Sequence, residues 1–298
     1  MNTRWNPNAT TVAGGKGEGN ELNQLSHPRG LDIDYDGTLY IADSGNHRIV
    51  EWKKNATAGR IVAGGNKGAG VDQLNDPTDV VIDHRNNSLI IADSQNRRVV
   101  RWPRENGRFG QILISSIRCW GLAMDYDGNL YITDMFANEV KLWNSTSNGA
   151  TLLIGEHGKG DQLNQLNRPH FIFVDENESM YIADLDNNRV MLWQKDEKQG
   201  IIIADAKGRG KNPIQLASPA AAFVDRLGIV YIVDGMNNRV VRVFKGIERR
   251  SEIVVGNNGQ GNHANQLYFP QDLAFDAENN LYVVDGSNHR VQKFSILS

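Results

Sequence analysis

The chain has 298 residues, of which 40% are hydrophobic and 22% are charged, and 32 Lys plus Arg against 35 Asp plus Glu give a formal net charge of −3. This composition is typical of a soluble globular protein and excludes a largely disordered chain. It provides no general attraction to nucleic acid, and no apolar run approaches the roughly 20 residues that a membrane-spanning helix needs.

The amino-terminal residues and the cysteine content narrow the class of protein further. The start, MNTRWNPNATT, lacks the basic stretch and apolar core of a secretory signal, so we expect none in this sequence. Cys119 is the single cysteine, which excludes an intrachain disulfide and a zinc site built from several cysteines. We interpret it as a small buried apolar residue.

The phrase YIADSGNHRIVEW, which begins at Tyr40, recurs along the chain in five further copies. The copies begin at Ile90, Tyr131, Tyr181, Tyr231 and Tyr282. All six share an aspartate, and successive aspartates are 50, 41, 50, 50 and 51 residues apart, at Asp43, Asp93, Asp134, Asp184, Asp234 and Asp285. A period of this length marks a solenoid, a propeller or an array of repeats.

The second period illustrates what one repeat contains. Pro77 opens the β-branched run VVID, the residues HRNN form a turn, and LIIAD and RVVRW are two further runs. A fourth run follows in most periods, beginning at Arg60, Thr151, Ile201 and Glu252. Each run has about five residues, which suits a strand and is too short for a helix.

Six periods of four antiparallel strands predict an all-β fold, a six-bladed β-propeller in a single domain that spans residues 1–298. The alternative, a β-helix, has a shorter period. The last unit ends after its third strand, and the chain begins with a fourth-strand pattern, NATTVAGG. We therefore predict that Thr10 to Ala13 pairs with the strand around Val291 to Phe294, so that the amino-terminal strand closes the last blade and removes exposed sheet edges.

The repeat unit, P-x-G-L-x-x-D-x-x-G-x-L-Y-I-A-D-x-x-N-x-R-I, resembles the NHL repeat. The best matches to the core of that repeat are Asn46, His47, Arg48 and Ile49, and again Asn288, His289, Arg290 and Val291. The resemblance covers essentially the whole chain and implies the same propeller fold. NHL-like propellers include peptide-amidating lyases, RNA-binding and protein-binding domains, and extracellular sensor domains, so the resemblance leaves the function open.

Several repeated residues are interpreted as structural. Each Asp and the Arg five residues later are predicted to hold the turn between the second and third strands and to tie it to the adjoining blade. Trp52, Trp102, Trp143 and Trp193 are predicted to lie in the core. The loops between blades share the pattern QLxxP, in which we expect Leu to fill the rim and Gln to satisfy backbone groups.

The third blade departs from this pattern. The stretch FGQILISSIRCWGLAMD has no Gly-rich loop and no QLxxP, which accounts for the step of 41 residues. The same blade has Glu139 in place of the repeated Arg, Met135 and Phe136 in the turn, and Trp120 at the start of its inner strand. These residues predict a notch with an apolar wall that binds a ligand or partner. The alternative is that neighbouring loops fill the gap and bury the side chains.

The residues that follow the blade-opening Pro are expected to surround the top of the central channel. They are Arg29, Thr78, Trp120, His170, Ala220 and Gln271, with Asp79 and Asp272 one position further along. The two carboxylates suit a hard cation such as Ca²⁺, and ordered water is the alternative content of the channel.

Three other kinds of site have little support in the sequence: a zinc lyase site, a phosphate-binding loop and an RNA-binding face. In the family's lyases, histidines after the blade-opening Pro of several blades hold zinc, whereas here only His170 occupies such a position. GGKGEG at Gly14 lacks the GK[ST] ending of a phosphate-binding loop. RNA binding requires a basic face, and the loops of this chain mix acidic and basic residues.

Five glycosylation sequons, at Asn8, Asn55, Asn86, Asn144 and Asn177, fall on the expected bottom turns. They indicate an extracellular protein, unless they reflect only the preference of turns for Asn and Ser. Whether the chain is a domain of a larger protein is left open.

We expect a monomeric, non-catalytic propeller without a cofactor that binds a protein, peptide or small ligand on its top face. The expected contact residues are Arg29, Asp79, Trp120, Met135, Phe136, His170, Gln271 and Asp272. The alternative is a metal-assisted lyase or hydrolase at the mouth of the channel, in which His170 and Arg29 participate and Asp79 or Asp272 holds the cation.

Overall fold

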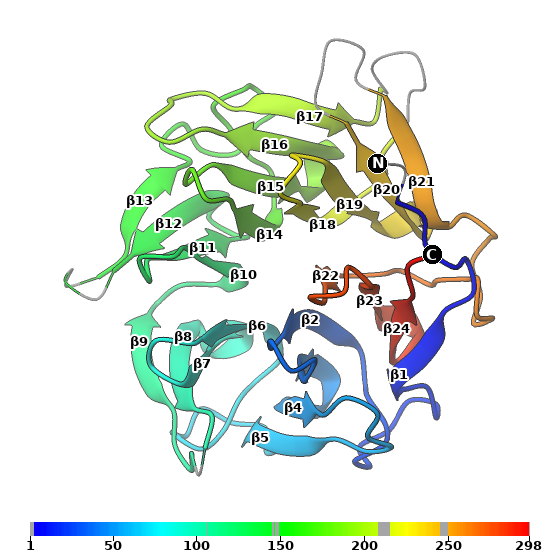
Figure 1. Ribbon diagram of the computed structural model, residues 1–298. Helices are drawn as coiled ribbons and strands as arrows, with labels where there is room; N and C mark the ends of the chain where they lie inside the picture. The colour runs from blue at the N-terminus through cyan, green and yellow to red at the C-terminus, as the bar shows by residue number, and fades with distance from the viewer. Residues whose placement is uncertain are drawn as a thin grey trace. The chain divides into compact units, whose positions relative to one another are not determined.

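The computed structural model describes residues 3–105, 107–144, 146, 149–207, 215–244 and 250–297. They fold into six four-stranded antiparallel sheets, the blades of a six-bladed β-propeller, which confirms the predicted fold class (Figure 1). Apart from the strands, the regular elements of these residues are short 3₁₀ turns. No helix in the described part of the chain is long and apolar enough to cross a bilayer.

The chain forms two compact units, Met1–Cys119 with Val255–Ser298, and Trp120–Val254. The first unit contains blades 1, 2 and 6. Blade 1 consists of β2 (Pro28–Ile33), β3 (Leu39–Asp43), β4 (Arg48–Trp52) and β5 (Arg60–Gly64). Blade 2 consists of β6 (Pro77–Asp83), β7 (Ser88–Asp93), β8 (Arg98–Pro103) and β9 (Gln111–Ser115). Blade 6 consists of β22 (Leu273–Phe275), β23 (Leu281–Asp285), β24 (Arg290–Phe294) and β1 (Thr10–Gly14).

The second unit contains blades 3, 4 and 5. Blade 3 consists of β10 (Cys119–Met124), β11 (Leu130–Asp134), β12 (Glu139–Trp143) and β13 (Thr151–Ile154). Blade 4 consists of β14 (Pro169–Val174), β15 (Met180–Asp184), β16 (Arg189–Trp193) and β17 (Ile201–Asp205). Blade 5 consists of β18 (Pro219–Val224), β19 (Val230–Asp234), β20 (Arg239–Val243) and β21 (Ser251–Gly256).

A 3₁₀ turn joins the second and third strands in most blades. These turns are η1 (Ser44–Asn46), η2 (Ser94–Asn96), η3 (Leu185–Asn187), η4 (Gly235–Asn237) and η5 (Gly286–Asn288). The residue after each turn adopts a left-handed conformation, and His47 and His289 do so at φ values of 55° and 54°. Side chains at these positions therefore leave the chain in a fixed direction at one end of the blade.

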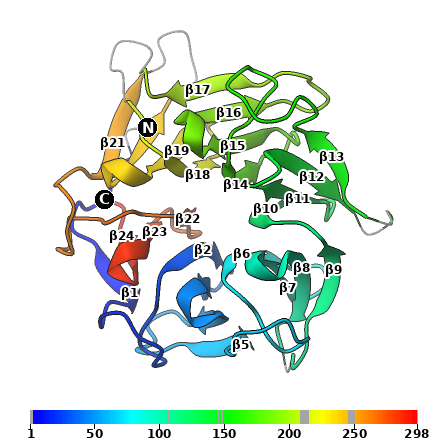
Figure 2. The ribbon, with the colours of Figure 1, turned by 180° about the vertical axis from the view of Figure 1, so that it is seen from behind.

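The amino-terminal strand completes blade 6, as predicted. β1 pairs antiparallel with β24, with Thr10 opposite Lys293 and Ala13 opposite Val291 (Figures 1 and 2). The hydroxyl of Thr11 also donates to Gln292 Oε1 at 2.7 Å. Because β1 covers the outer edge of β24, that edge has no unpaired row of backbone groups to attract another chain.

The core lies between neighbouring blades. In the first unit, Tyr40 and Ile49 of blade 1 pack against Val80, Ile91 and Trp102 of blade 2. A second cluster joins blades 6 and 1, and two comparable clusters in the second unit join blade 3 to blade 4 and blade 4 to blade 5. The four repeated tryptophans are buried, as expected: Trp52, Trp102, Trp143 and Trp193. A lone blade leaves its sheet faces exposed, so the same residues recur wherever two blades meet.

The repeated Asp and Arg have the structural role that the sequence predicts. In blade 1, Arg48 Nε donates to Asp43 Oδ2 at 2.6 Å, and its Nη2 donates to the carbonyls of Glu21 and Gln24. Asp43 also accepts the amide of Ser26 at 2.7 Å. The pair therefore fixes the turn and holds the loop that arrives from the preceding blade, and neither residue is available for chemistry.

The QLxxP loops also behave as predicted. The leucines are buried, and the side chains of Gln24, Gln73, Gln165 and Gln266 bond to the backbone, as in the bond from Gln24 Nε2 to the Lys16 carbonyl at 3.1 Å. Before blade 3, where this motif is missing, Ile117 is buried and its amide donates to the Arg97 carbonyl at 3.1 Å. A different apolar residue thus fills the rim where the loop is shortest.

Candidate functional site

The top of a blade is defined here as the end that carries the turn between its second and third strands. The inner strand begins at the same end, because Pro28 lies opposite Asp43 in blade 1 and Pro169 lies opposite Asp184 in blade 4. The residues that follow the blade-opening Pro therefore lie at the top of their blades, as the sequence indicates.

On the first unit, neighbouring groups hold two of the expected contact residues. Arg29 forms an ion pair with Asp76, with Nη1 and Oδ2 3.0 Å apart and both side chains about three-quarters buried. Gln271 is buried, and its Nε2 donates to the Phe269 carbonyl at 3.3 Å. Both polar groups thus contribute to the local structure of the rim.

The two expected carboxylates lie along the inner strands and accept backbone amides. Asp272 accepts the amide of Leu31 in the next blade at 2.9 Å and the amide of Leu273 at 2.8 Å. Asp79 is buried and accepts the amide of Val80 at 2.8 Å. Carboxylates in these positions satisfy backbone amides of the inner strands.

Asp32 belongs to the same arrangement, and the sequence analysis did not identify it. Its carboxylate accepts the amide of Ile82 in blade 2 and that of Ile33, both at 2.8 Å. Burial raises the pKa of Asp32 to about 6, against the opposing effect of these two amides. Burial, together with the charge of Asp32, raises the pKa of Asp272 to about 7. The feature of the sequence that could have identified Asp32 is its position as a charged residue between the apolar residues Leu31 and Ile33.

On the second unit, Trp120 and His170 lie together. Their rings stack with centroids 4.3 Å apart and an interplanar angle of 29°. Gly121 makes this approach possible, because a Cβ added there would lie 2.6 Å from the Cα of Phe171. His170 is buried, whereas Trp120 is partly exposed, so the indole presents an aromatic surface at the top of blades 3 and 4.

The two apolar residues expected in the turn of blade 3 lie in different environments. Met135 is buried, with Arg168 Nη2 4.0 Å from its sulfur. Phe136 is 56% exposed, and its backbone amide donates to Asp134 Oδ1 at 3.2 Å. Met135 therefore packs inside the blade, and Phe136 is the apolar side chain of this turn that a ligand can reach.

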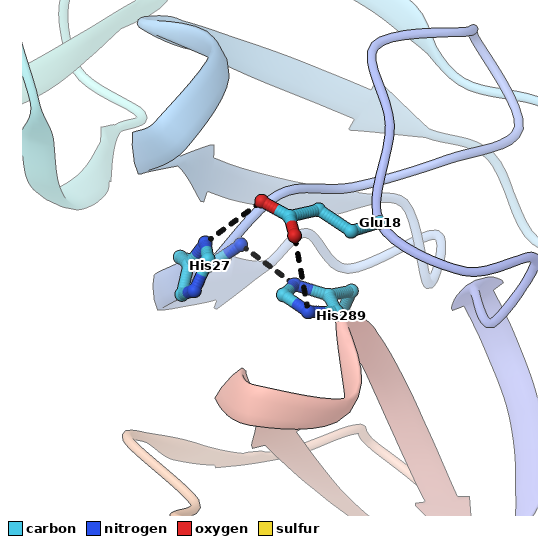
Figure 3. Close-up of side chains that lie close together, drawn as sticks. All are labelled: Glu18, His27 and His289. Carbon is cyan, nitrogen blue, oxygen red and sulfur yellow. Dashed lines mark hydrogen bonds and ion pairs between the residues drawn. The ribbon is translucent and has the colours of Figure 1, made fainter.

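A third group of side chains, which we call the rim cluster, consists of Glu18, His27 and His289 (Figure 3). His27 Nδ1 lies 3.3 Å from Glu18 Oε1, and His289 Nε2 lies 3.9 Å from Glu18 Oε2. The hydroxyl of Ser26 donates to Glu18 Oε1 at 2.9 Å, and this bond is the main cause of the lowered pKa of Glu18. The sequence analysis did not identify the cluster, because His27 and His289 are 262 positions apart in the chain.

The ligand atoms of the rim cluster lie within 4.8 Å of one another, a spacing that suits a divalent metal ion. Histidines that bind metals normally offer one ring nitrogen to the ion and donate the N–H of the other. His289 has the opposite arrangement, since its Nδ1 accepts the backbone amide of His27 at 3.1 Å. The ring proton of neutral His289 is therefore on Nε2, the nitrogen that faces Glu18, and this tautomer does not suit a metal ligand.

The same backbone contact recurs in both units and supports this tautomer. The amide of Asp76 donates to His47 Nδ1 at 3.1 Å, and in the second unit the amide of Arg168 donates to Asn138 Oδ1 at 2.8 Å. The amide of Ser218 likewise donates to Asn188 Oδ1 at 2.8 Å. Because the asparagines use an oxygen there, the position requires an acceptor, and both histidines supply it through Nδ1.

Comparison with known protein folds shows similarity without close sequence relationship. An auxiliary nutrient-binding protein from Bacteroides thetaiotaomicron is 16% identical, with a TM-score of 0.76 over 100% of this chain and 78% of that one. An inactive virginiamycin B lyase from Staphylococcus aureus with quinupristin is 12% identical, with a TM-score of 0.64 over 99% and 100% of the chains. A gluconolactonase from Xanthomonas campestris is 12% identical, with a TM-score of 0.67 over 93% and 88%. At these identities the likeness establishes the fold alone.

A search of curated proteins by sequence gives no significant match. The family model of the NHL repeat matches residues 25–52 and 267–294. These segments contain the two motifs that resemble the repeat most closely, one in blade 1 and one in blade 6. The chain is a six-bladed β-propeller that carries NHL repeats.

Proposed function

We propose that this propeller is a non-catalytic binding module that recognises a protein, peptide or small ligand at the top of its second unit. The observation that carries the proposal is the combination of the Trp120–His170 stack with the exposed Phe136 of the same blade. Partly exposed aromatic side chains supply much of the binding energy at recognition surfaces, because they bury a large area with few rotatable bonds.

The short connection before blade 3 supports this location. Only residues 116–118 separate β9 from β10, whereas residues 15–27 separate β1 from β2. The rim next to Trp120 therefore lacks the Gly-rich QLxxP loop that precedes the other blades. The similarity in fold to the nutrient-binding protein is compatible with a binding role, and the proposal includes no cofactor.

A selection from a random peptide library, followed by affinity measurements on the selected peptides, tests the proposal. Phe136→Ser is expected to weaken binding about tenfold or more, the loss typical of a central aromatic contact. Met236→Ser is the matched control, because Met236 holds the same position in the turn of blade 5 and is similarly exposed, at 61%. Equal affinities for the wild type and Phe136→Ser would place binding elsewhere and contradict the proposal.

The alternative is a metal-assisted lyase or hydrolase on the first unit, with Asp272 or Asp79 holding the cation. The buried carboxyl groups on neighbouring inner strands favour this alternative, because carboxylate oxygens are the ligands that a hard cation prefers. Metal analysis of protein dialysed against Ca²⁺ and Zn²⁺ separates the two functions. A stoichiometric ion that Asp272→Asn removes supports the enzyme, whereas the binding module is expected to retain none at this place.

A further inference from the structure

The rim cluster is built around a backbone contact that a proton can break. His289 follows η5 at the top of blade 6, and His27 precedes Pro28 at the start of blade 1. The bond from the His27 amide to His289 Nδ1 therefore connects these two blades. His27 has a positive φ of 47°, an unfavourable conformation for a non-glycine residue, so this bond helps to hold a strained point of the rim.

Protonation of His289 reverses this contact. The only site on the neutral ring that can take a proton is Nδ1, since Nε2 already carries one. Once protonated, Nδ1 becomes a donor and faces the donating amide of His27, so the bond is replaced by a repulsive pair of N–H groups. At the matching positions of blades 3 and 4, Asn138 and Asn188 accept the amide with an oxygen that does not titrate in this range.

We propose that the rim cluster is an acid-sensitive latch, in which proton uptake by His289 releases from blade 6 the His27 end of the loop of residues 15–27 that connects β1 to blade 1. This device concerns the first unit and is independent of the ligand site proposed on the second unit. Through this device, the pH of the solution determines whether the end of the segment that follows β1 is bonded to blade 6.

The charged groups around His289 define the direction of the effect. Glu18 and His27 face it from the rim loop, Asp43 from the end of β3, and Asp285 from its own blade. Asp43 and Asp285 are each paired with an arginine, which reduces their attraction for a further positive charge. The rings of His27 and His289 meet edge to face with centroids 4.6 Å apart, so a charge on one ring opposes a charge on the other.

The electrostatic balance agrees with the geometry. Burial is the main cause that lowers the pKa of His289, and the neighbouring His27 adds to it, whereas Glu18 opposes them. A histidine with a lowered pKa in the folded protein contributes stability above its ordinary pKa, near 6.5, and loses this contribution as the pH falls through the folded value. The latch is therefore closed at neutral pH and opens on acidification.

Hydrogen exchange at the His27 amide between pH 5 and pH 8 tests the latch directly. In the wild type, the protection factor is expected to be constant at the upper end of this range and to fall about tenfold per pH unit once His289 is protonated. His289→Asn keeps an acceptor at the position, as in blades 3 and 4, and should give a protection factor that does not vary with pH. The proposal would be overturned if the protection factor of the wild type did not change with pH, or if His289→Asn showed the same loss of protection on acidification.

Two further measurements separate the latch from its competitors. His47→Asn changes the equivalent contact in the neighbouring blade and should leave the pH dependence at His27 intact; if it abolishes that dependence, the effect does not arise at His289. Nitrogen NMR of the imidazoles should detect the proton of His289 on Nε2 at pH 8. Zn²⁺ binding at that pH, removed by His289→Asn, would show a free lone pair on Nε2 and would rule out the latch in favour of a metal site.

Discussion

The pair formed by Asp43 and Arg48 shows how single residues of the repeat determine the geometry of a blade. Asp43 is fully buried and accepts an amide, an asparagine side chain and the guanidinium of Arg48. Burial nevertheless raises the pKa of Asp43, against the effects of these partners. A buried carboxylate of this kind depends on all of its donors, because removal of one leaves a charge in a poorly solvated place.

Replacement of Arg48 by Met is therefore expected to destabilise the protein by about 3–5 kcal/mol, the usual cost of breaking a buried ion pair. Urea unfolding at pH 7 measures this loss. The double variant Asp43→Asn with Arg48→Met removes both charges and should lose less than the sum of the two single variants. Strict additivity of the losses would show that the pair does not act as a unit.

At the scale of strands and loops, the repeats predict most of what the structure contains. The period, the strand order and the pairing of β1 with β24 follow from runs of five apolar residues and from the two ends of the chain. The rim cluster does not follow from the sequence, because His27 and His289 are 262 positions apart and meet only when blade 6 lies beside blade 1. The sequence also does not show that residue 289 accepts a backbone amide. This role becomes clear only in the structure, where Asn138 and Asn188 accept the equivalent amides.

The closing strand provides a test at this scale. Deletion of residues 1–14 removes β1 and exposes the edge of β24, which is expected to pair with other copies of the chain. Size-exclusion chromatography with light scattering should then find oligomers, where the full chain is expected to be a monomer. Thr11→Ala removes only the bond to Gln292 and serves as the control that keeps the strand. A deleted chain that remains folded and monomeric would refute this role of β1.

For the molecule as a whole, two groups of residues in the first unit respond to pH in opposite directions. Asp32 and Asp272 bind a proton more tightly in the fold than at the ordinary aspartate pKa of 3.8, so their contribution to stability is complete below that value. It is lost as the pH rises through about 6 and about 7. His289 has the opposite effect and weakens the fold on acidification. Because the two aspartates together lose more stability than His289 gains as the pH rises, the free energy of unfolding is expected to fall as the pH rises above 3.8. His289 offsets part of this fall below its ordinary pKa near 6.5.

The two contributions can be separated in the His289→Asn background, where the acid-sensitive contact is absent. There the free energy of unfolding should fall as the pH rises from 5 to 8, by up to about 1.4 kcal/mol per pH unit for each proton released. Adding Asp272→Asn removes one titrating group and its repulsion of Asp32, so the fall should become shallower. Asp72→Asn, which changes an exposed carboxylate, should leave the slope unaltered. Parallel slopes with and without Asp272 would mean that the inner-strand carboxylates are ionised throughout this range, which would contradict the prediction.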